Sequence, residues 1–283
     1  MYINIKGANS LANRRSSIAI RKDYPSYHDL MITKKGNRLK LLGRSVKTDK
    51  RKKINGEDVG ITVSVLYLSP NIKAGYGINT CPWAGSCVVS CLTYSGRLGI
   101  HHPNQALKTQ ALYAYPKRFL QQIINEIEIE SVKARQAGDI LYVRLNGTSD
   151  IKWESLLCFE KMVQDFNGLG GFYDYTKAPA KARSLSDNYH LTYSIDEQNV
   201  SLSRAMDYRA IGQPIAVVGS KKDVAELLSK DIGLIDGDNN DMRFFDSGVV
   251  LLSQKNLIKG SYPNNGLVQS KENILSLLNT TIN

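Results

Sequence analysis

The sequence lacks long hydrophobic runs. No apolar stretch approaches the roughly 18 residues that a helix needs to cross a bilayer, and the opening MYINIKGANSLANRRSS has no apolar core of the kind found in a secretory signal. These absences argue against a membrane protein and against an exported one. We therefore expect a soluble, cytoplasmic protein with no membrane partner.

Cysteine is also scarce, with four residues in a chain of 283. Three of the four, Cys81, Cys87 and Cys91, fall within eleven residues. In a chain without a secretion signal, such a cluster favours metal or redox chemistry over disulfides. Cys158 stands apart in WESLLCFEKMV, where the helical spacing of apolar residues predicts that it is a buried core residue.

Acidic residues are scarce at the start of the chain. Residues 1–60 hold 15 Lys and Arg against 5 Asp and Glu, whereas the remaining residues hold 22 against 21. We interpret residues 1–60 as a basic N-terminal extension with one short hairpin around ITKKGNRLKLL. Such an arm can bind nucleic acid through its phosphates, but it can equally be a solvated segment that keeps the protein in solution.

The rest of the chain, residues 61–283, alternates between apolar strands and helices, which is typical of an α/β fold with a parallel sheet. Neither a GxGxxG nor a Walker-type loop is present, so we predict a complete or partial (β/α) barrel in preference to a Rossmann fold. Pro116 is expected to split or kink the first helix. The predicted strands are 61–70, 140–147, 171–176, 189–194, 214–220, 232–236 and 248–254, and the predicted helices are 104–136, 153–166, 201–211 and 222–231.

The three clustered cysteines lie directly after the first predicted strand, with the spacing Cys81-x5-Cys87-x3-Cys91. Thiolates are soft ligands that suit iron–sulfur clusters and zinc. Three of them would hold a [4Fe–4S] cluster and leave one iron open to another ligand. A structural zinc site closed by His101 or His102 is the alternative, and three reduced core cysteines without a metal are the simplest reading.

Polar residues follow the second and fourth strands. In RLNGTSD, the side chains of Asn146, Thr148 and Asp150 can hydrogen-bond an ammonium group or a ribose, and the fourth strand ends in Ser194. We predict that these four residues bind a cofactor at the carboxyl ends of the strands. The alternative for Asp150 is a helix cap, because it directly precedes a predicted helix.

The third strand ends in YDYTK, where Tyr173, Tyr175 and Lys177 share one face. We predict that Tyr175 and Lys177 contact a substrate, although aromatic strand residues more often belong to a core.

The segment DGDNNDMRFFD follows a late strand. It lacks the terminal glutamate of an EF-hand, so we reject a calcium loop. We predict substrate contacts from Asp236, Asp238 and Arg243. A polar turn in which Asp side chains bond their own backbone explains the segment equally well.

Several of these motifs occur together in one protein family. INTCPWAGSCVVSCLTYSGR, KTQALYAYPKRF, VRLNGTSDIKWE, FYDYTK, NYHLTYS and DGDNNDMRFFD resemble the phage family known as gene product 88, over about residues 60–260. The resemblance implies phage origin and the cytoplasm of a bacterial host.

More distantly, the cysteine loop and the barrel pattern look like the radical S-adenosylmethionine superfamily, although the common x3 and x2 cysteine spacing is absent. That likeness implies a [4Fe–4S] cluster, bound S-adenosylmethionine and an enzyme of unknown substrate. The alternative is a nucleic-acid-binding phage protein with a structural zinc site and no catalytic activity.

Overall fold

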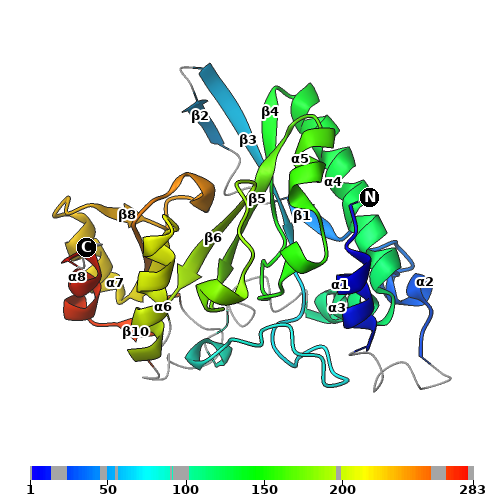
Figure 1. The fold of residues 1–283 in the computed structure, drawn as a ribbon, viewed down its shortest axis with the longest axis horizontal. Helices are drawn as coiled ribbons and strands as arrows, with labels where there is room; N and C mark the ends of the chain where they lie inside the picture. The colour runs from blue at the N-terminus through cyan, green and yellow to red at the C-terminus, as the bar shows by residue number, and fades with distance from the viewer. Residues whose placement is uncertain are drawn as a thin grey trace. The chain divides into compact units, whose positions relative to one another are not determined.

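The computed structural model divides the chain into two compact units (Figure 1), each described here by itself. The first unit comprises Met1–Pro82, Ile100–Phe172 and Ser184–Tyr189, and the second comprises Trp83–Gly99, Tyr173–Arg183 and His190–Asn283. The structure describes residues 2–13, 24–44, 50–54, 57–89, 91, 102–195, 199–255 and 266–279.

The sheet of the first unit is built on the long strand β3, Glu57–Leu66. The side chains of Ile61, Val63 and Val65 are buried, as are those of Thr62 and Ser64 between them, so both faces of β3 are covered. Near-continuous burial of this kind is expected for a parallel strand with elements packed on both faces. The other strands of this sheet are β1 (Leu42–Arg44), β2 (Lys50–Ile54), β4 (Asp139–Arg144) and β5 (Leu169–Thr176).

Strands β4 and β5 follow β3 in parallel, whereas β1 and β2 pair with β3 in antiparallel register. In a closed barrel the first parallel strand would pair with the last one. Here the outer edge of β3 is taken instead by β1 and β2, which come from residues that the sequence analysis left outside the fold. The predicted barrel is therefore not confirmed, and what stands is a mixed α/β fold.

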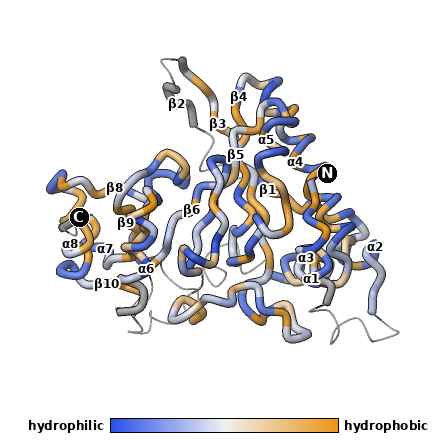
Figure 2. Tube along the Cα trace, in the orientation of Figure 1, coloured by the Kyte–Doolittle hydropathy of each residue, from blue (hydrophilic) through white to orange (hydrophobic). Residues whose placement is uncertain are grey.

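Helix α3 (His102–Ala114) ends where α4 (Pro116–Gln136) begins. Pro116 occupies the first turn of α4, where its missing N–H is not needed, but it could not continue the hydrogen bonds of α3. The predicted split of this helix is confirmed. Apolar residues of α4 recur at helical spacing, and Figure 2 shows hydrophobic and hydrophilic residues alternating along it. The other helices of the unit are α1 (Ile5–Asn13), α2 (Tyr27–Leu30) and α5 (Phe159–Asp165).

The basic N-terminal extension is not supported as a segment outside the core. Ile3 forms a bridge with Leu157, and Ala8 on α1 is fully buried. The predicted hairpin appears as a tight turn in which Ile32 pairs with Arg38. Basic composition alone could not reveal these contacts, because a few apolar residues among many charges are enough to anchor a segment.

Cys158 is exposed, so the prediction that it is buried is wrong. The predicted helix 153–166 is interrupted: a 3₁₀ turn spans Trp153–Ser155, and α5 begins only at Phe159, with Cys158 as its N-cap. The helical spacing therefore applies to Phe159 and Met162, which are buried, and not to Cys158.

The second unit contains the strand order β5-β6-β7-β9-β8, in which β6–β7, β7–β9 and β9–β8 are parallel pairs. Strand β8 lies outside β9 although it precedes it in the chain. A barrel needs its strands in sequential order, and among the described residues β8 has no other strand partner. The remaining elements are β6 (Tyr189–Ser194), β7 (Ile215–Gly219), β8 (Leu234–Asp236), β9 (Val249–Ser253), β10 (Val268–Gln269), α6 (Asn199–Ala210), α7 (Lys221–Leu228) and α8 (Lys271–Asn279).

None of the helices in the described parts of the chain combines the length and apolar character that crossing a membrane requires.

Candidate functional site

Cys81 lies in the first unit, in the loop that leaves the carboxyl end of β3. Its half-buried Sγ accepts a hydrogen bond from the backbone N–H of Asn71, with 3.3 Å between the two atoms. The hydroxyl of Thr80 is 3.7 Å from the sulfur, and as a thiol Cys81 can donate to the carbonyl of Thr148 at 3.8 Å. Polar groups from three residues therefore lie beside the sulfur.

The loop around Cys81 is held by short hydrogen bonds. Thr80 is fully buried, and its hydroxyl donates to the carbonyl of Ser69 at 2.7 Å while its N–H donates to the carbonyl of Asn71 at 3.2 Å. The carbonyl of Thr80 accepts the N–H of Asp150 at 2.8 Å. This last bond ties the loop after β3 to the RLNGTSD loop after β4, as expected for neighbouring parallel strands.

His102, at the start of α3, reaches the same loop. Its Nε2 lies 3.2 Å from the hydroxyl oxygen of Ser69, whose backbone is bonded to Thr80 and, through its N–H, to Thr109. Of the two histidines proposed for a zinc site, His102 is thus near the Cys81 loop. His101 lies outside the described residues.

Asn146 shapes the loop after β4. Its Oδ1 accepts hydrogen bonds from the hydroxyl of Ser149 (2.9 Å), the N–H of Ile151 (2.9 Å) and the indole N–H of Trp153 (3.0 Å), and its Nδ2 donates to the carbonyl of Ile151. The side chain is 2% exposed. The amide is thus engaged within the protein, and its predicted contact with a cofactor stays a prediction.

Gly147 and Thr148 bind this loop to the end of β3. The N–H of Gly147 donates to the carbonyl of Leu66, and a Cβ at this position would come within 2.7 Å of side-chain atoms of Val65 and Tyr67. The hydroxyl of Thr148 donates to the carbonyl of Leu68. Only glycine allows the two loops to approach so closely.

In the second unit, Trp83 connects the remainder of the cysteine loop to the ends of β5 and β6. The guanidinium carbon of Arg204 lies 5.8 Å from the centre of the Trp83 ring, and Arg204 donates to the carbonyl of Lys177. The Lys177 ammonium donates in turn to the carbonyl of Ser194 (2.9 Å) and to its hydroxyl (3.2 Å). Two predicted site residues, Lys177 and Ser194, are therefore in direct contact.

Cys87 lies in a 3₁₀ turn, Ser86–Val88, and both it and Cys91 are half-buried in this unit. Across the described residues, no group of three or more His, Cys, Asp or Glu side chains is arranged to hold a metal ion.

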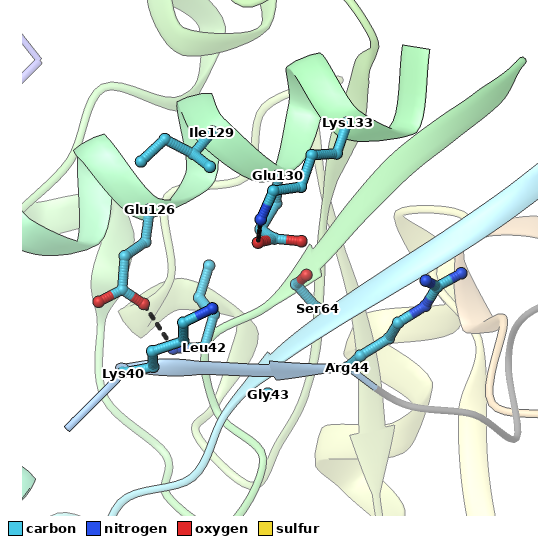
Figure 3. A pocket seen from close by; sticks show the side chains of 9 residues that line it. All are labelled: Lys40, Leu42, Gly43, Arg44, Ser64, Glu126, Ile129, Glu130 and Lys133. Carbon is cyan, nitrogen blue, oxygen red and sulfur yellow. Dashed lines mark hydrogen bonds and ion pairs between the residues drawn. The ribbon is translucent and has the colours of Figure 1, made fainter. Parts of the chain in front are cut away.

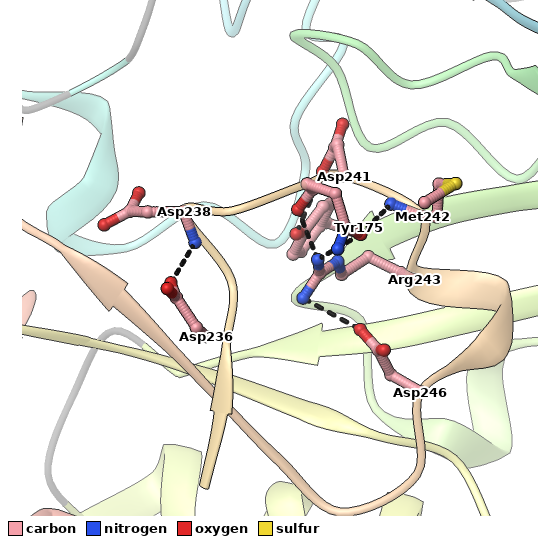
Figure 4. Close-up of polar contacts among 8 residues, drawn as sticks. Tyr175, Asp236, Asp238, Asp241, Met242, Arg243 and Asp246 are labelled. Atoms are coloured by element: carbon pink, nitrogen blue, oxygen red, sulfur yellow. Dashed lines mark hydrogen bonds and ion pairs between the residues drawn. The ribbon is translucent and has the colours of Figure 1, made fainter. Parts of the chain in front are cut away.

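The 240–246 segment of the second unit covers the Tyr175 side of β5 (Figure 4). The Tyr175 hydroxyl donates to Oδ1 of Asp241 at 3.1 Å. Arg243 is fully buried; its Nη1 lies 2.8 Å from Oδ2 of Asp246, and its Nη2 donates to Asn240. The buried guanidinium thus contacts Asp246 and Asn240 of its own loop.

Asp236 and Asp238 act within their own turn. Oδ1 of Asp236 accepts the N–H of Asp238 at 2.9 Å (Figure 4), and Oδ2 of Asp238 accepts the N–H of Ser253 at 2.8 Å. Lys255 forms an ion pair with Asp238. These contacts agree with the alternative of a polar turn, while substrate contacts by the two carboxylates stay a prediction.

Burial lowers the pKa of His190 on β6 to about 4, with the Arg243 backbone acting in the opposite direction. In the unfolded chain the pKa of this histidine is near 6.5. Between pH 6.5 and 4 the unfolded chain therefore binds more protons than the folded chain. We expect stability to be lost as the pH falls through this range, by up to about 3 kcal/mol. Urea unfolding at several pH values should show a weaker pH dependence in His190→Gln than in wild type.

The control for this experiment is His28→Gln, whose side chain is largely exposed. It should keep the wild-type pH dependence. The same slope in His190→Gln and wild type would contradict the assignment.

A pocket of about 420 Å³ lies elsewhere in the first unit, between β1 and α4 (Figure 3). Its carboxylates are engaged by the protein: Glu126 accepts the backbone N–H groups of Leu41 and Leu42, and Glu130 pairs with Lys133 at 2.7 Å. No motif in the sequence predicted this pocket. Its lining residues are Lys40, Leu42, Gly43, Arg44, Ser64, Glu126, Ile129, Glu130 and Lys133.

No sequence motif predicted the roles of Asn71 and Thr80, which contact the sulfur of Cys81, or of Ser69, whose carbonyl accepts the Thr80 hydroxyl. The position of Thr80 directly before the first cysteine was the one available signal.

The comparisons with known proteins bear on this site. The family model described as Gene product 88 matches residues 33–265, a range that contains every predicted site residue. None of the curated proteins and none of the solved structures compared with the chain matched it.

Proposed function

Because this chain belongs to the gene product 88 family of phage proteins, we propose that it is a phage protein that binds an iron–sulfur cluster through Cys81, Cys87 and Cys91. It would act in the cytoplasm of the host cell. Three thiolates are a donor set that suits such a cluster and leaves one iron open for a further ligand.

The observation that best supports this proposal is the hydrogen bond from the Asn71 N–H to Sγ of Cys81. A donor directed at sulfur stabilises the thiolate form, which is the form that binds metal. A cysteine that served only as core packing would lie among apolar side chains. Instead, Cys81 lies beside the carbonyl of Thr148, at the carboxyl ends of β3 and β4.

We further propose that the protein is an enzyme of the radical S-adenosylmethionine type, with its parallel strands acting as a partial (β/α) barrel. Held by Cys81, Cys87 and Cys91, such a cluster would supply one-electron reduction of the sulfonium of S-adenosylmethionine. Thr148, Asp150, Asn146 and Ser194 are the residues proposed to hold the cofactor. Those proposed to face the substrate are Tyr175, Lys177, Asp236, Asp238 and Arg243.

Metal and sulfide analysis after anaerobic purification tests the proposal. We expect a brown protein with broad absorbance near ~400 nm, about four irons and about four acid-labile sulfides per chain. Addition of S-adenosylmethionine to the reduced protein should change the electron paramagnetic resonance signal, because the ligand binds at the open iron. A colourless protein that contains one zinc per chain would rule the proposal out.

A nucleic-acid-binding protein with a structural zinc site is the second candidate. Two observations favour it: β2, Lys50–Ile54, has four basic residues in the sequence KRKKI, and His102 reaches the loop of Cys81. Binding of a short DNA duplex at low and high salt tests it. Binding that falls steeply with salt, and that is lost when the four basic residues are changed to glutamate, would support this candidate; no binding at low salt would exclude it.

A further inference from the structure

The pocket of the first unit contains a buried hydroxyl that the protein does not use. Arg44 on β1 is paired with Ser64 on β3, so the two side chains leave the sheet on the same face. Ser64 is 2% exposed and lines the pocket of about 420 Å³ (Figure 3). Among the residues that the structure describes, the Ser64 hydroxyl has no hydrogen-bond partner. Buried polar groups in native proteins are almost always hydrogen-bonded, so this hydroxyl is available to a ligand.

One face of α4 forms the opposite wall of the pocket (Figure 3). The helix contributes four lining residues at the spacing i, i+3, i+4 and i+7, which places them on one side of it: Glu126, Ile129, Glu130 and Lys133. Oε2 of Glu126 lies 2.9 Å from the backbone nitrogens of both Leu41 and Leu42. Glu130 forms an ion pair with Lys133. Both carboxylates of this wall are therefore already bonded within the protein.

Positive charge exceeds negative charge around the pocket. Three cations and two carboxylates line it, namely Lys40, Arg44, Lys133, Glu126 and Glu130. Lys40 forms no ion pair with any residue in the described parts of the chain. A hydroxyl donor beside surplus cationic side chains is complementary to an anion, because hydrogen bonds and ion pairs to a charged acceptor are stronger than those to a neutral one.

We propose that this pocket binds a small phosphate-bearing ligand, whose phosphate accepts a hydrogen bond from Ser64 and pairs with Lys40 and Arg44. The volume lies in the range of about 300–1,000 Å³ that is usual for ligand pockets. A phosphate group presents three charged acceptor oxygens, one for each of these side chains, whereas a carboxylate presents two. Leu42 and Ile129 line the same pocket and would contact the organic part of the ligand. None of these residues belongs to the proposed cluster or cofactor site, so this inference does not rest on the proposed function.

Isothermal titration calorimetry of the full chain with inorganic phosphate at low ionic strength tests the proposal. We expect one saturable site per chain. Ser64→Ala removes the hydroxyl and little else, and it should weaken binding about tenfold, as expected for loss of a hydrogen bond to a charged group. Lys40 is exposed, and water screens its charge, so Lys40→Gln should weaken binding by only about threefold.

Two matched variants on α4 serve as controls. Ser131→Ala removes another buried serine hydroxyl, which is 1% exposed and donates to the carbonyl of Glu128 at 2.8 Å. Lys117→Gln removes an exposed charge of α4 that does not line the pocket. Both should bind phosphate as the wild type does. Circular dichroism confirms that each variant is folded.

Titrations with acetate and with a short DNA duplex separate phosphate from other anions. Acetate should bind more weakly than phosphate, and equal affinity would mean that the pocket accepts any small anion. If the duplex binds in a way that depends on Ser64 while free phosphate does not bind, the pocket belongs to a nucleic-acid surface and the small-ligand proposal is wrong. It is also overturned if the wild type does not bind phosphate, or if Ser64→Ala and Lys40→Gln bind it with wild-type affinity.

Discussion

Replacing any one of Cys81, Cys87 and Cys91 with serine should remove most of the iron from the anaerobically purified protein. Loss of one thiolate leaves two, which do not hold a cubane, and we expect iron occupancy to fall by more than about tenfold. Iron and sulfide analysis of the three single variants, with the absorbance near ~400 nm, measures this effect. Equal losses in all three would indicate one shared centre.

Cys158→Ser provides the matched control. Cys158 is exposed and precedes α5, so its replacement removes a thiol without opening a cavity. Iron content should stay at the wild-type level. If only one of the three loop cysteines mattered, or if Cys158→Ser lost as much iron as the others, the shared centre would be disproved.

Asn146→Leu should destabilise the protein by about 3–9 kcal/mol, which is a large part of the stability of a typical domain. Leucine has a similar size but cannot accept the hydrogen bonds of Ser149, Ile151 and Trp153, so three buried donors would lose their partner at about 1–3 kcal/mol each. Urea unfolding gives the change in free energy of unfolding. Asn125→Leu is the control, because Asn125 is exposed and accepts one bond from Gln121.

This experiment also separates two roles for Asn146. If the side chain serves mainly to build the loop, stability falls and cofactor affinity falls with it. A change in stability below about 1 kcal/mol, together with a selective loss of S-adenosylmethionine binding, would mean instead that the amide acts on the ligand.

The sequence determined the local elements of this protein. The pattern of apolar residues predicted β6 at its observed limits. It predicted β7, β9, α6 and α7 to within a few residues of their observed limits. Pro116 ended one helix and began the next because a proline has no N–H to donate and a fixed φ. The sequence also led from the clustered cysteines and neighbouring motifs to the family that the family model matches.

Tertiary structure decided which strands became neighbours and which polar groups became buried. Alternating strands and helices are compatible with either an open or a closed sheet, and the choice was made by β1 and β2, which occupy the edge of β3. The β1 pairing joins residues 20 to 24 positions apart, from Arg44–Ser64 to Leu42–Leu66, whereas β2 and β3 are consecutive strands that pair from Ile54–Glu57 to Lys50–Ile61.

The environment of the candidate site residues was likewise decided by the way their loops fold. Asn146 looks like a ligand-binding residue in RLNGTSD, yet its partners include the indole of Trp153, seven residues away, in a buried loop. Asn71 carried no signal in the sequence; its N–H meets Cys81 because the loop between them folds back and Thr80 closes it. The spacing of cysteines in a sequence can predict that a thiol is a metal ligand. The hydrogen-bond donors around its sulfur depend on backbone geometry, which only the folded chain determines.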